Sequence, residues 1–219
     1  MDQHPIPVCA VDYLNSVPLV WGMLHGPQRE QVQLQFAIPS ICSEVIERRK
    51  AVAGLVPVAE IVRQNLEIVP GVGIVSRGAV RSILLISKVP IRLIRTLAAD
   101  SSSRSSVRLA AVILRERYGV QPEFRSQSPD LDTMLSDCDA ALIIGDPALR
   151  LNPEQLPYET LDLGAEWQAL TNLPMVFAVW AGSGPLDSAN LEAIFSGSYD
   201  FGKAHIQQIA ESEFKRRGI

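Results

Sequence analysis

Residues 97–118 read LAADSSSRSSVRLAAVILRERY, a stretch typical of a strand that runs through a polar loop into a helix. Leu97–Asp100 has the short apolar composition of a buried strand, and five serines follow within the next six residues. From Ser105 to Tyr118 the apolar residues recur at the spacing of one helical face. That face is predicted to comprise Val107, Ala110, Ala111, Leu114 and Tyr118, with Arg104, Arg108 and Arg115 on the other side.

The same alternation of β-rich runs and amphipathic stretches continues on both sides of this unit, which predicts an α/β fold with largely parallel sheets. The other expected strands are Ile6–Val11, Gln33–Ile38, Ala53–Val56, Val80–Ser87, Ala140–Ile144 and Met175–Trp180. The other expected helices are Ser40–Lys50, Val58–Gln64, Ile91–Leu97, Asp187–Phe195 and Tyr199–Arg217.

The alternation restarts after Pro90, and an apolar strand returns at Met175, which together predict two lobes joined by two crossings. The crossings are expected near Ser87–Pro90 and near Pro174–Ala181. Residues 1–90 and 175–219 would then form a discontinuous first lobe, and residues 91–174 a second lobe inserted into it. Neither crossing has the composition of a disordered linker.

The composition indicates a globular protein that binds neither membranes nor nucleic acid. Of 219 residues, 47% are hydrophobic and 20% charged, and the net charge is −4. No apolar run approaches the roughly 20 residues that cross a bilayer. No secretory signal is recognisable at the start, so a cytoplasmic location is expected. The basic clusters Arg48–Lys50 and Lys215–Arg217 end helical patterns and are interpreted as solvated helix ends.

Cysteine and histidine residues form no pattern that predicts a metal site, a disulfide or a nucleophile. They lie far apart, at Cys9, Cys42, Cys138, His4, His25 and His205. The cysteines are therefore interpreted as small core residues, and neither a metal nor a cofactor is expected. No Ser/His/Asp spacing, P-loop or GxGxxG motif is present either. Any reaction would rely on positioning and hydrogen bonding.

The serine-rich segment Asp100–Ser106 is the strongest candidate for ligand binding. The start of a helix offers N–H groups and the positive end of the helix dipole to an anion. Hydroxyl groups add donors without bulk, and Arg104 adds positive charge. The alternative is a cap that only starts the helix, but one serine suffices for a cap. Carboxylate binding is therefore the favoured interpretation.

A second candidate is the loop Asp12–Leu19, which follows the first strand at the end where α/β sheets bind ligands. Asn15 offers an amide that donates and accepts. The alternative, a turn before a helix with Pro18 at its first position, fits equally well. Ser40 and Ser82 are placed on this same lobe, where each by itself fits an ordinary cap or strand hydroxyl. Less informative positions are Asp146, interpreted as a helix cap, and Trp167 and Trp180, interpreted as packing residues.

Five stretches resemble, in order along the chain, the chorismate dehydratase family of the futalosine route to menaquinone. They are Tyr13–Leu19 (YLNSVPL), Gly54–Glu60 (GLVPVAE), Asp100–Ser106 (DSSSRSS), Ile143–Leu149 (IIGDPAL) and Trp167–Trp180 (WQALTNLPMVFAVW). The resemblance implies a two-lobed fold like that of type II periplasmic binding proteins, with a ligand cleft between the lobes. It implies no secretion signal.

The resemblance also implies a lyase activity, the removal of water from chorismate to give 3-[(1-carboxyvinyl)oxy]benzoate. In that case Asn15 and Ser82 would be catalytic, with Ser40 in contact with the substrate. A substrate carboxylate would be bound from the second lobe by Ser103, Arg104, Ser105 and Ser106. As a hypothesis, the substrate's own side-chain carboxylate takes the ring proton, because the motifs contain no evident base.

Two departures from the family pattern stand out. Ser105 occupies a position where the family usually has threonine, which keeps the hydroxyl group. The family also continues with helical sequence beyond the position of Ile219. Two other functions fit the same residues: a 1,4-dihydroxy-6-naphthoate synthase-like enzyme, and a non-catalytic module that binds a small aromatic or enolpyruvyl carboxylate. The oligomeric state is left open.

Overall fold

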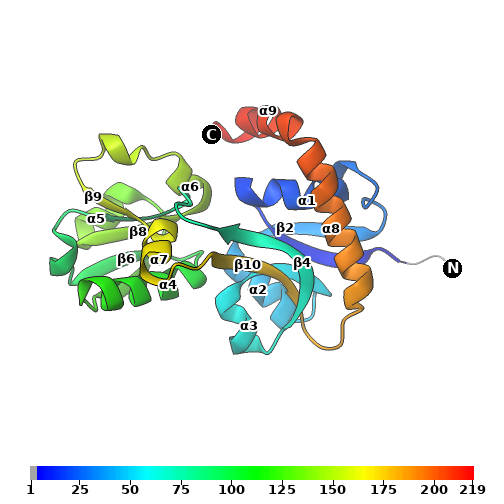
Figure 1. Cartoon of the computed structure of the whole chain (residues 1–219), viewed down its shortest axis with the longest axis horizontal. Helices are drawn as coiled ribbons and strands as arrows, with labels where there is room; N and C mark the ends of the chain where they lie inside the picture. The colour runs from blue at the N-terminus through cyan, green and yellow to red at the C-terminus, as the bar shows by residue number, and fades with distance from the viewer. Residues whose placement is uncertain (1–3) are drawn as a thin grey trace. The chain divides into compact units, whose positions relative to one another are not determined.

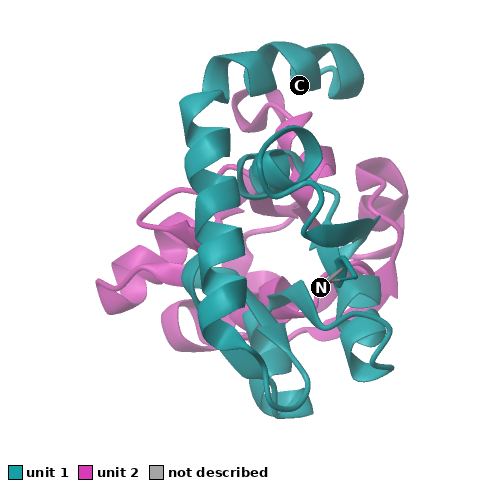
Figure 2. Ribbon diagram, turned by 90° about the vertical axis from the view of Figure 1, so that its right-hand side faces the viewer, with its two compact units in different colours: residues 1–74, 176–219 teal, residues 75–175 magenta. Residues whose placement is uncertain are grey.

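The computed structural model describes residues 4–219, which form two compact units (Figures 1 and 2). Unit 1 combines the chain up to Ile74 with Val176–Ile219, and unit 2 is the continuous segment Val75–Met175. Each unit has its own five-stranded sheet. No helix within residues 4–219 is long and apolar enough to cross a membrane.

The sheet of unit 1 has the strand order β2-β1-β3-β10-β4. Its strands are β1 (Ile6–Val11), β2 (Val32–Ala37), β3 (Ala53–Pro57), β4 (Glu67–Ser76) and β10 (Met175–Gly182). Its α-helices are α1 (Val17–His25), α2 (Pro39–Glu47), α3 (Val58–Gln64), α8 (Ser188–Ala204) and α9 (Ile206–Arg217). Strand β1 is parallel to β2 and β3, whereas β10 returns antiparallel to β3. The parallel strands bring the loops after β1 and β2 to the same edge of the sheet.

The core of unit 1 lies where buried strands meet α1, α2 and α8. Val8 to Val11 of β1 are all buried, as is Leu55 of β3. Trp180 is fully buried and stacks on Phe195 at a centroid distance of 4.3 Å, as expected of a packing residue.

Helices α1 and α8 approach closely, side by side in Figure 1, because glycines lie at their contact. A β-carbon at Gly202 would overlap the backbone carbonyl of Pro18. At Gly197, five residues earlier in α8, it would meet only the flexible amide end of Gln28.

Gly202→Ala is therefore expected to destabilise the protein by about 1–3 kcal/mol, the usual cost of overpacking a closed contact. Gly197→Ala is the matched control, because the Gln28 side chain can move and alanine favours the helix by about 1 kcal/mol. Urea unfolding of both variants tests this. Equal midpoints for the two would show that α1 and α8 separate without cost.

The sheet of unit 2 has the strand order β7-β6-β8-β5-β9. Its strands are β5 (Ile83–Ser87), β6 (Thr96–Asp100), β7 (Glu123–Gln127), β8 (Ala140–Ile144) and β9 (Glu159–Asp162). Its α-helices are α4 (Ser105–Ile113), continued by a π-helical turn Leu114–Tyr118, then α5 (Leu131–Asp137), α6 (Gly145–Leu149) and α7 (Leu163–Thr171). Short 3-10 turns lie at Leu14–Ser16 in unit 1 and at Ile91–Leu93 and Pro153–Gln155 in unit 2. Strand β6 is parallel to β7 and β8, and β5 is antiparallel to β8 and β9.

The predicted position of the first crossing is wrong. It was expected near Ser87–Pro90, with residues 1–90 in the first lobe, but unit 2 begins at Val75. The reason is strand β5, which pairs with β8 and β9 and so completes the second sheet. An apolar run such as Ile83–Ser87 predicts a buried strand but does not indicate which sheet receives it.

Two helix predictions are also corrected. The segment Ile91–Leu97 holds only the 3-10 turn Ile91–Leu93, after which β6 begins at Thr96. Helix α8 continues through Phe195–Tyr199 and ends at Ala204, so the two predicted C-terminal helices meet at His205 instead.

The buried face of α4 is rotated from the predicted one. Leu109 and Ile113 are buried together with Ala110 and Leu114, whereas Val107 and Ala111 are only half-buried. Because α4 packs against both β8 and α7, it buries a wider arc than a helix that covers a sheet alone.

Candidate carboxylate-binding site

A buried carboxylate organises the serine-rich segment at the end of β6. Asp100 is 1% exposed, and its Oδ1 accepts hydrogen bonds from the N–H of Ser102 at 2.9 Å and from the Ser102 hydroxyl at 2.7 Å. Its Oδ2 accepts from the N–H of Ile144, at the end of β8, at 3.4 Å. These three donors satisfy the buried carboxylate, and the one from Ile144 links the loop to the neighbouring strand.

The start of the helix that follows, α4, is held by hydrogen bonds of Ser103. The N–H of Ser103 donates to the carbonyl of Asp100 at 3.0 Å, and the Ser103 hydroxyl accepts from the N–H of Ser106 at 3.2 Å. The Ser103 hydroxyl therefore caps the first turn of α4 from the position just before its N-cap residue, Arg104. Ser102, Ser103, Ser105 and Ser106 are buried, whereas Ser101 is exposed and Arg104 is half-buried. One serine suffices to cap the helix, and the hydroxyls of Ser105 and Ser106 stand at its positive end.

Ser82 lies at this same edge of the sheet of unit 2. Its carbonyl accepts a hydrogen bond from the N–H of Gly145 at 2.7 Å. Gly145 has a φ of 65°, a conformation that favours glycine, and it turns the chain from β8 into α6. Asp146 is buried in the first turn of α6, but it is not the predicted cap, because the N-cap position is Ile144 and no side chain caps this helix. Ser82, Asp100 and Asp146 thus flank the end of β8.

The predicted grouping of Ser82 with Ser40 is wrong. Ser40 belongs to unit 1, and Ser82 belongs to unit 2 because it immediately precedes β5. Its neighbours are the serine-rich segment and the start of α6. The candidate site in unit 2 therefore comprises Ser82, Ser103, Arg104, Ser105 and Ser106, supported by Asp100.

Unit 1 gathers the remaining predicted residues after β1 and β2. Asn15 lies in the 3-10 turn Leu14–Ser16 and is exposed, with its Oδ1 within 3.4 Å of the Ser16 hydroxyl. Ser40 is buried in the first turn of α2. The N–H of Asp12 donates to the carbonyl of Ala37 at 3.1 Å, which ties the two loops together. Asn15 and Ser40 therefore occur at one edge of the sheet.

A partly buried ion network joins the first loop to α9, and sequence reasoning missed it. The side chain of Arg217 is 8% exposed and lies 2.5 Å from Glu213 and 2.6 Å from Oδ1 of Asp12. Arg217 also donates to the carbonyl of Asp12 at 3.3 Å. Arg216, which is 52% exposed, donates to Glu213 at 2.7 Å. Within the basic cluster at the end of α9, Arg216 and Arg217 are thus paired with carboxylates, so the interpretation as a simply solvated helix end is wrong for these two residues.

The network lowers the pKa of both carboxyl groups. Burial by itself raises the pKa of Glu213, but hydrogen bonds from Arg216 and Arg217 outweigh burial and leave the pKa below its usual value. The same balance, with Arg217 as the stronger partner, holds the pKa of Asp12 below its usual range. Both groups favour their charged forms in the folded protein.

The free energy of unfolding is therefore expected to fall on acidification. A carboxyl whose pKa is lower in the folded state stabilises the protein above its unfolded pKa, and this stability is lost as pH falls through the folded pKa. Urea unfolding at pH 7 and in stepwise more acidic buffers should show a steeper loss for the wild type than for Glu213→Gln. Parallel pH profiles for the two proteins would contradict the role of Glu213.

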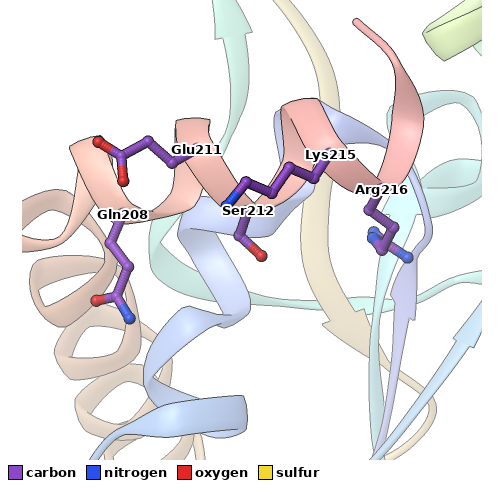
Figure 3. Close-up of a pocket in the computed structure, with 5 residues that line it drawn as sticks. All are labelled: Gln208, Glu211, Ser212, Lys215 and Arg216. Atoms are coloured by element: carbon purple, nitrogen blue, oxygen red, sulfur yellow. The ribbon is translucent and has the colours of Figure 1, made fainter.

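A shallow hollow of about 490 Å³ lies along α9 (Figure 3). It is lined by Gln208, Glu211, Ser212, Lys215 and Arg216. Their spacing of three and four residues places them on one face of the helix, as the close-up shows. A single convex helix cannot enclose a ligand, and no residue predicted for substrate contact lines the hollow. We do not assign it to the site.

Solved structures share this fold. Protein AF1704 from Archaeoglobus fulgidus has a TM-score of 0.75 at 15% identity and is matched over 100% of this chain and 84% of its own. The periplasmic aliphatic sulphonate binding protein of Escherichia coli has a TM-score of 0.64 at 15% identity, over 100% of this chain and 76% of its own. The predicted periplasmic-binding-protein-like fold is confirmed.

Sequence comparison gives the family. The chorismate dehydratase of Thermus thermophilus is 29% identical over 174 residues, which cover 72% of this chain and 63% of that protein. The chain thus spans less than two thirds of this relative's length. Residues 6–219 match the family described as menaquinone biosynthesis, nearly the whole chain. The chain therefore belongs to the menaquinone biosynthesis family.

Proposed function

We propose that the protein dehydrates chorismate to 3-[(1-carboxyvinyl)oxy]benzoate, and so acts as a carbon–oxygen lyase in menaquinone biosynthesis. The observation that carries the proposal is the serine-rich helix start in unit 2. There Ser103 caps α4, while the buried Ser105 and Ser106 stand at the positive end of the helix. Family membership and the similarity to a chorismate dehydratase support the same activity. A cytoplasmic location is part of the proposal.

The chemistry of chorismate suits a site built from hydroxyls and helix ends. Chorismate carries two carboxylates, and charge-assisted hydrogen bonds to a carboxylate are short and strong. Ser103, Arg104, Ser105 and Ser106 are proposed to bind one carboxylate.

The reaction removes the ring hydroxyl and a ring proton as water, and the ring becomes aromatic. Much of the driving force therefore lies in the substrate, and the protein must mainly hold a reactive conformer. Asn15 and Ser82 are proposed to assist the leaving hydroxyl by hydrogen bonding, and Ser40 to contact the substrate. We further propose that the substrate's side-chain carboxylate accepts the ring proton.

A second candidate function is binding without catalysis. It is favoured by the fold, since one of the similar structures is a periplasmic binding protein for aliphatic sulphonates. Such a module would use the same serine-rich segment to hold an aromatic or enolpyruvyl carboxylate.

Incubation with chorismate separates the two candidates. The chain is mixed with chorismate at neutral pH, and samples are followed by liquid chromatography with mass detection. The proposal predicts loss of chorismate with formation of a product lighter by one water. Unchanged chorismate in a mixture where titration calorimetry detects binding would identify a binding module and reject the lyase.

A further inference from the structure

Arg217 connects α9 with the loop that carries Asn15. Its guanidinium contacts the carboxylate and the main-chain carbonyl of Asp12, three residues before Asn15. Guanidinium groups form such multidentate contacts in a fixed geometry, so they define the position of the group they bind.

Arg217 is itself held in place by other contacts of α9. Glu213, with a 6% exposed side chain, binds Arg217 at 2.5 Å one helical turn away. Ile209 of α9 is buried against Val17 and Trp21 of α1, the helix that begins directly after the loop. Helix α9 therefore touches the first loop through Asp12 and the following helix through Ile209.

We propose that Arg217 is a positioning residue, which holds the Asp12–Ser16 loop and thereby the amide of Asn15. This inference rests on the proposed function, in which Asn15 contacts the substrate. Asn15 is exposed, and its Oδ1 lies 3.4 Å from the hydroxyl of Ser16 in the same turn, so the position of its amide depends on the main chain of the loop. The contact of Arg217 with the Asp12 carbonyl acts on that main chain directly.

The matched control is Arg63 in the same unit. Like Arg217, it pairs with a buried glutamate on its own helix, Glu60 at 2.6 Å, and with a second carboxylate, Glu47 at 3.2 Å on α2. Arg63 is 43% exposed against 8% for Arg217, so Arg63→Met should cost less stability than Arg217→Met, and it leaves the first loop untouched. A change in the first loop that exceeds the difference in the unfolding free energies of the two variants isolates positioning from general stability.

Two readouts are compared for Arg217→Met, Asp12→Asn, Arg217→Lys and Arg63→Met. The first is steady-state chorismate turnover, where a misplaced group is expected to lower kcat about 10- to 100-fold with little change in KM. The second is deuterium exchange of the peptide spanning residues 11–17 without substrate. Arg217→Met and Asp12→Asn should lower kcat and speed exchange. Arg217→Lys should give values of kcat and of the exchange rate between those of Arg217→Met and the wild type. Arg63→Met should match the wild type in both.

The outcomes separate this inference from the proposed function. A wild type that leaves chorismate unchanged rejects the proposed function, while the exchange data still decide whether Arg217 holds the loop. If exchange in Arg217→Met equals that in Arg63→Met, the loop does not depend on Arg217 and the inference is overturned. Faster exchange with an unaltered kcat overturns it as well.

Discussion

Asn15→Ala is expected to lose about 100- to 1000-fold in chorismate turnover while its melting temperature stays within a few degrees of the wild type. Removal of one preorganised donor that stabilises developing charge typically costs this much in kcat. Asn15 is exposed, and the hydrogen bond that its Oδ1 accepts from the neighbouring Ser16 is long, at 3.4 Å, so little folding free energy depends on its side chain. Steady-state kinetics and thermal unfolding of the variant give both quantities.

A second exposed asparagine of unit 1 provides the control for this prediction. Asn190 lies in the first turn of α8, away from the loops after β1 and β2. Asn190→Ala should keep both the turnover and the melting temperature. Near-normal turnover in Asn15→Ala would return Asn15 to its alternative interpretation as a turn residue.

The double variant Ser105→Ala/Ser106→Ala is expected to weaken binding of the product analogue 3-carboxymethoxybenzoate by about 30-fold or more. Each charge-assisted hydrogen bond to the carboxylate contributes about 1–3 kcal/mol. The helix itself should persist, because the hydroxyl of Ser103 caps the N–H of Ser106, and that N–H remains in the variant. Calorimetric titration of wild type and variant measures the difference.

The exposed Ser101 of the same segment is the matched control. Ser101→Ala removes a hydroxyl from the loop but not from the start of α4, so it should bind the analogue like the wild type. Equal affinity in wild type and double variant would reduce the segment to a helix cap.

Local sequence patterns predicted most elements of the fold, because apolar periodicity and burial follow from the same side chains. Strand Ile6–Val11, strand Ala140–Ile144 and helix Val58–Gln64 have the predicted bounds. The assignment of β5 to a sheet was wrong, since pairing partners depend on contacts distant in the chain. The same limit explains why Ser82 was grouped with Ser40.

The candidate site could be predicted only where its residues are adjacent in sequence. The serine-rich segment signals its own chemistry, and the Ser103 cap follows directly from it. The Asp12–Arg217 contact joins residues 205 positions apart, and the basic cluster at the end of α9 resembles any solvated helix end. The one available signal was a lone aspartate in the first loop, which indicates no partner by itself.

Proton NMR of chorismate during incubation with the protein tests the proposed activity most directly. If the protein dehydrates chorismate, the signal of the proton on the ring carbon that bears the hydroxyl disappears, while aromatic protons of a 1,3-disubstituted ring appear in the matching molar amount. The enolpyruvyl protons should persist, because that group stays attached. The same chorismate spectrum after prolonged incubation, with lines only broadened by binding, would contradict dehydration and leave a binding protein.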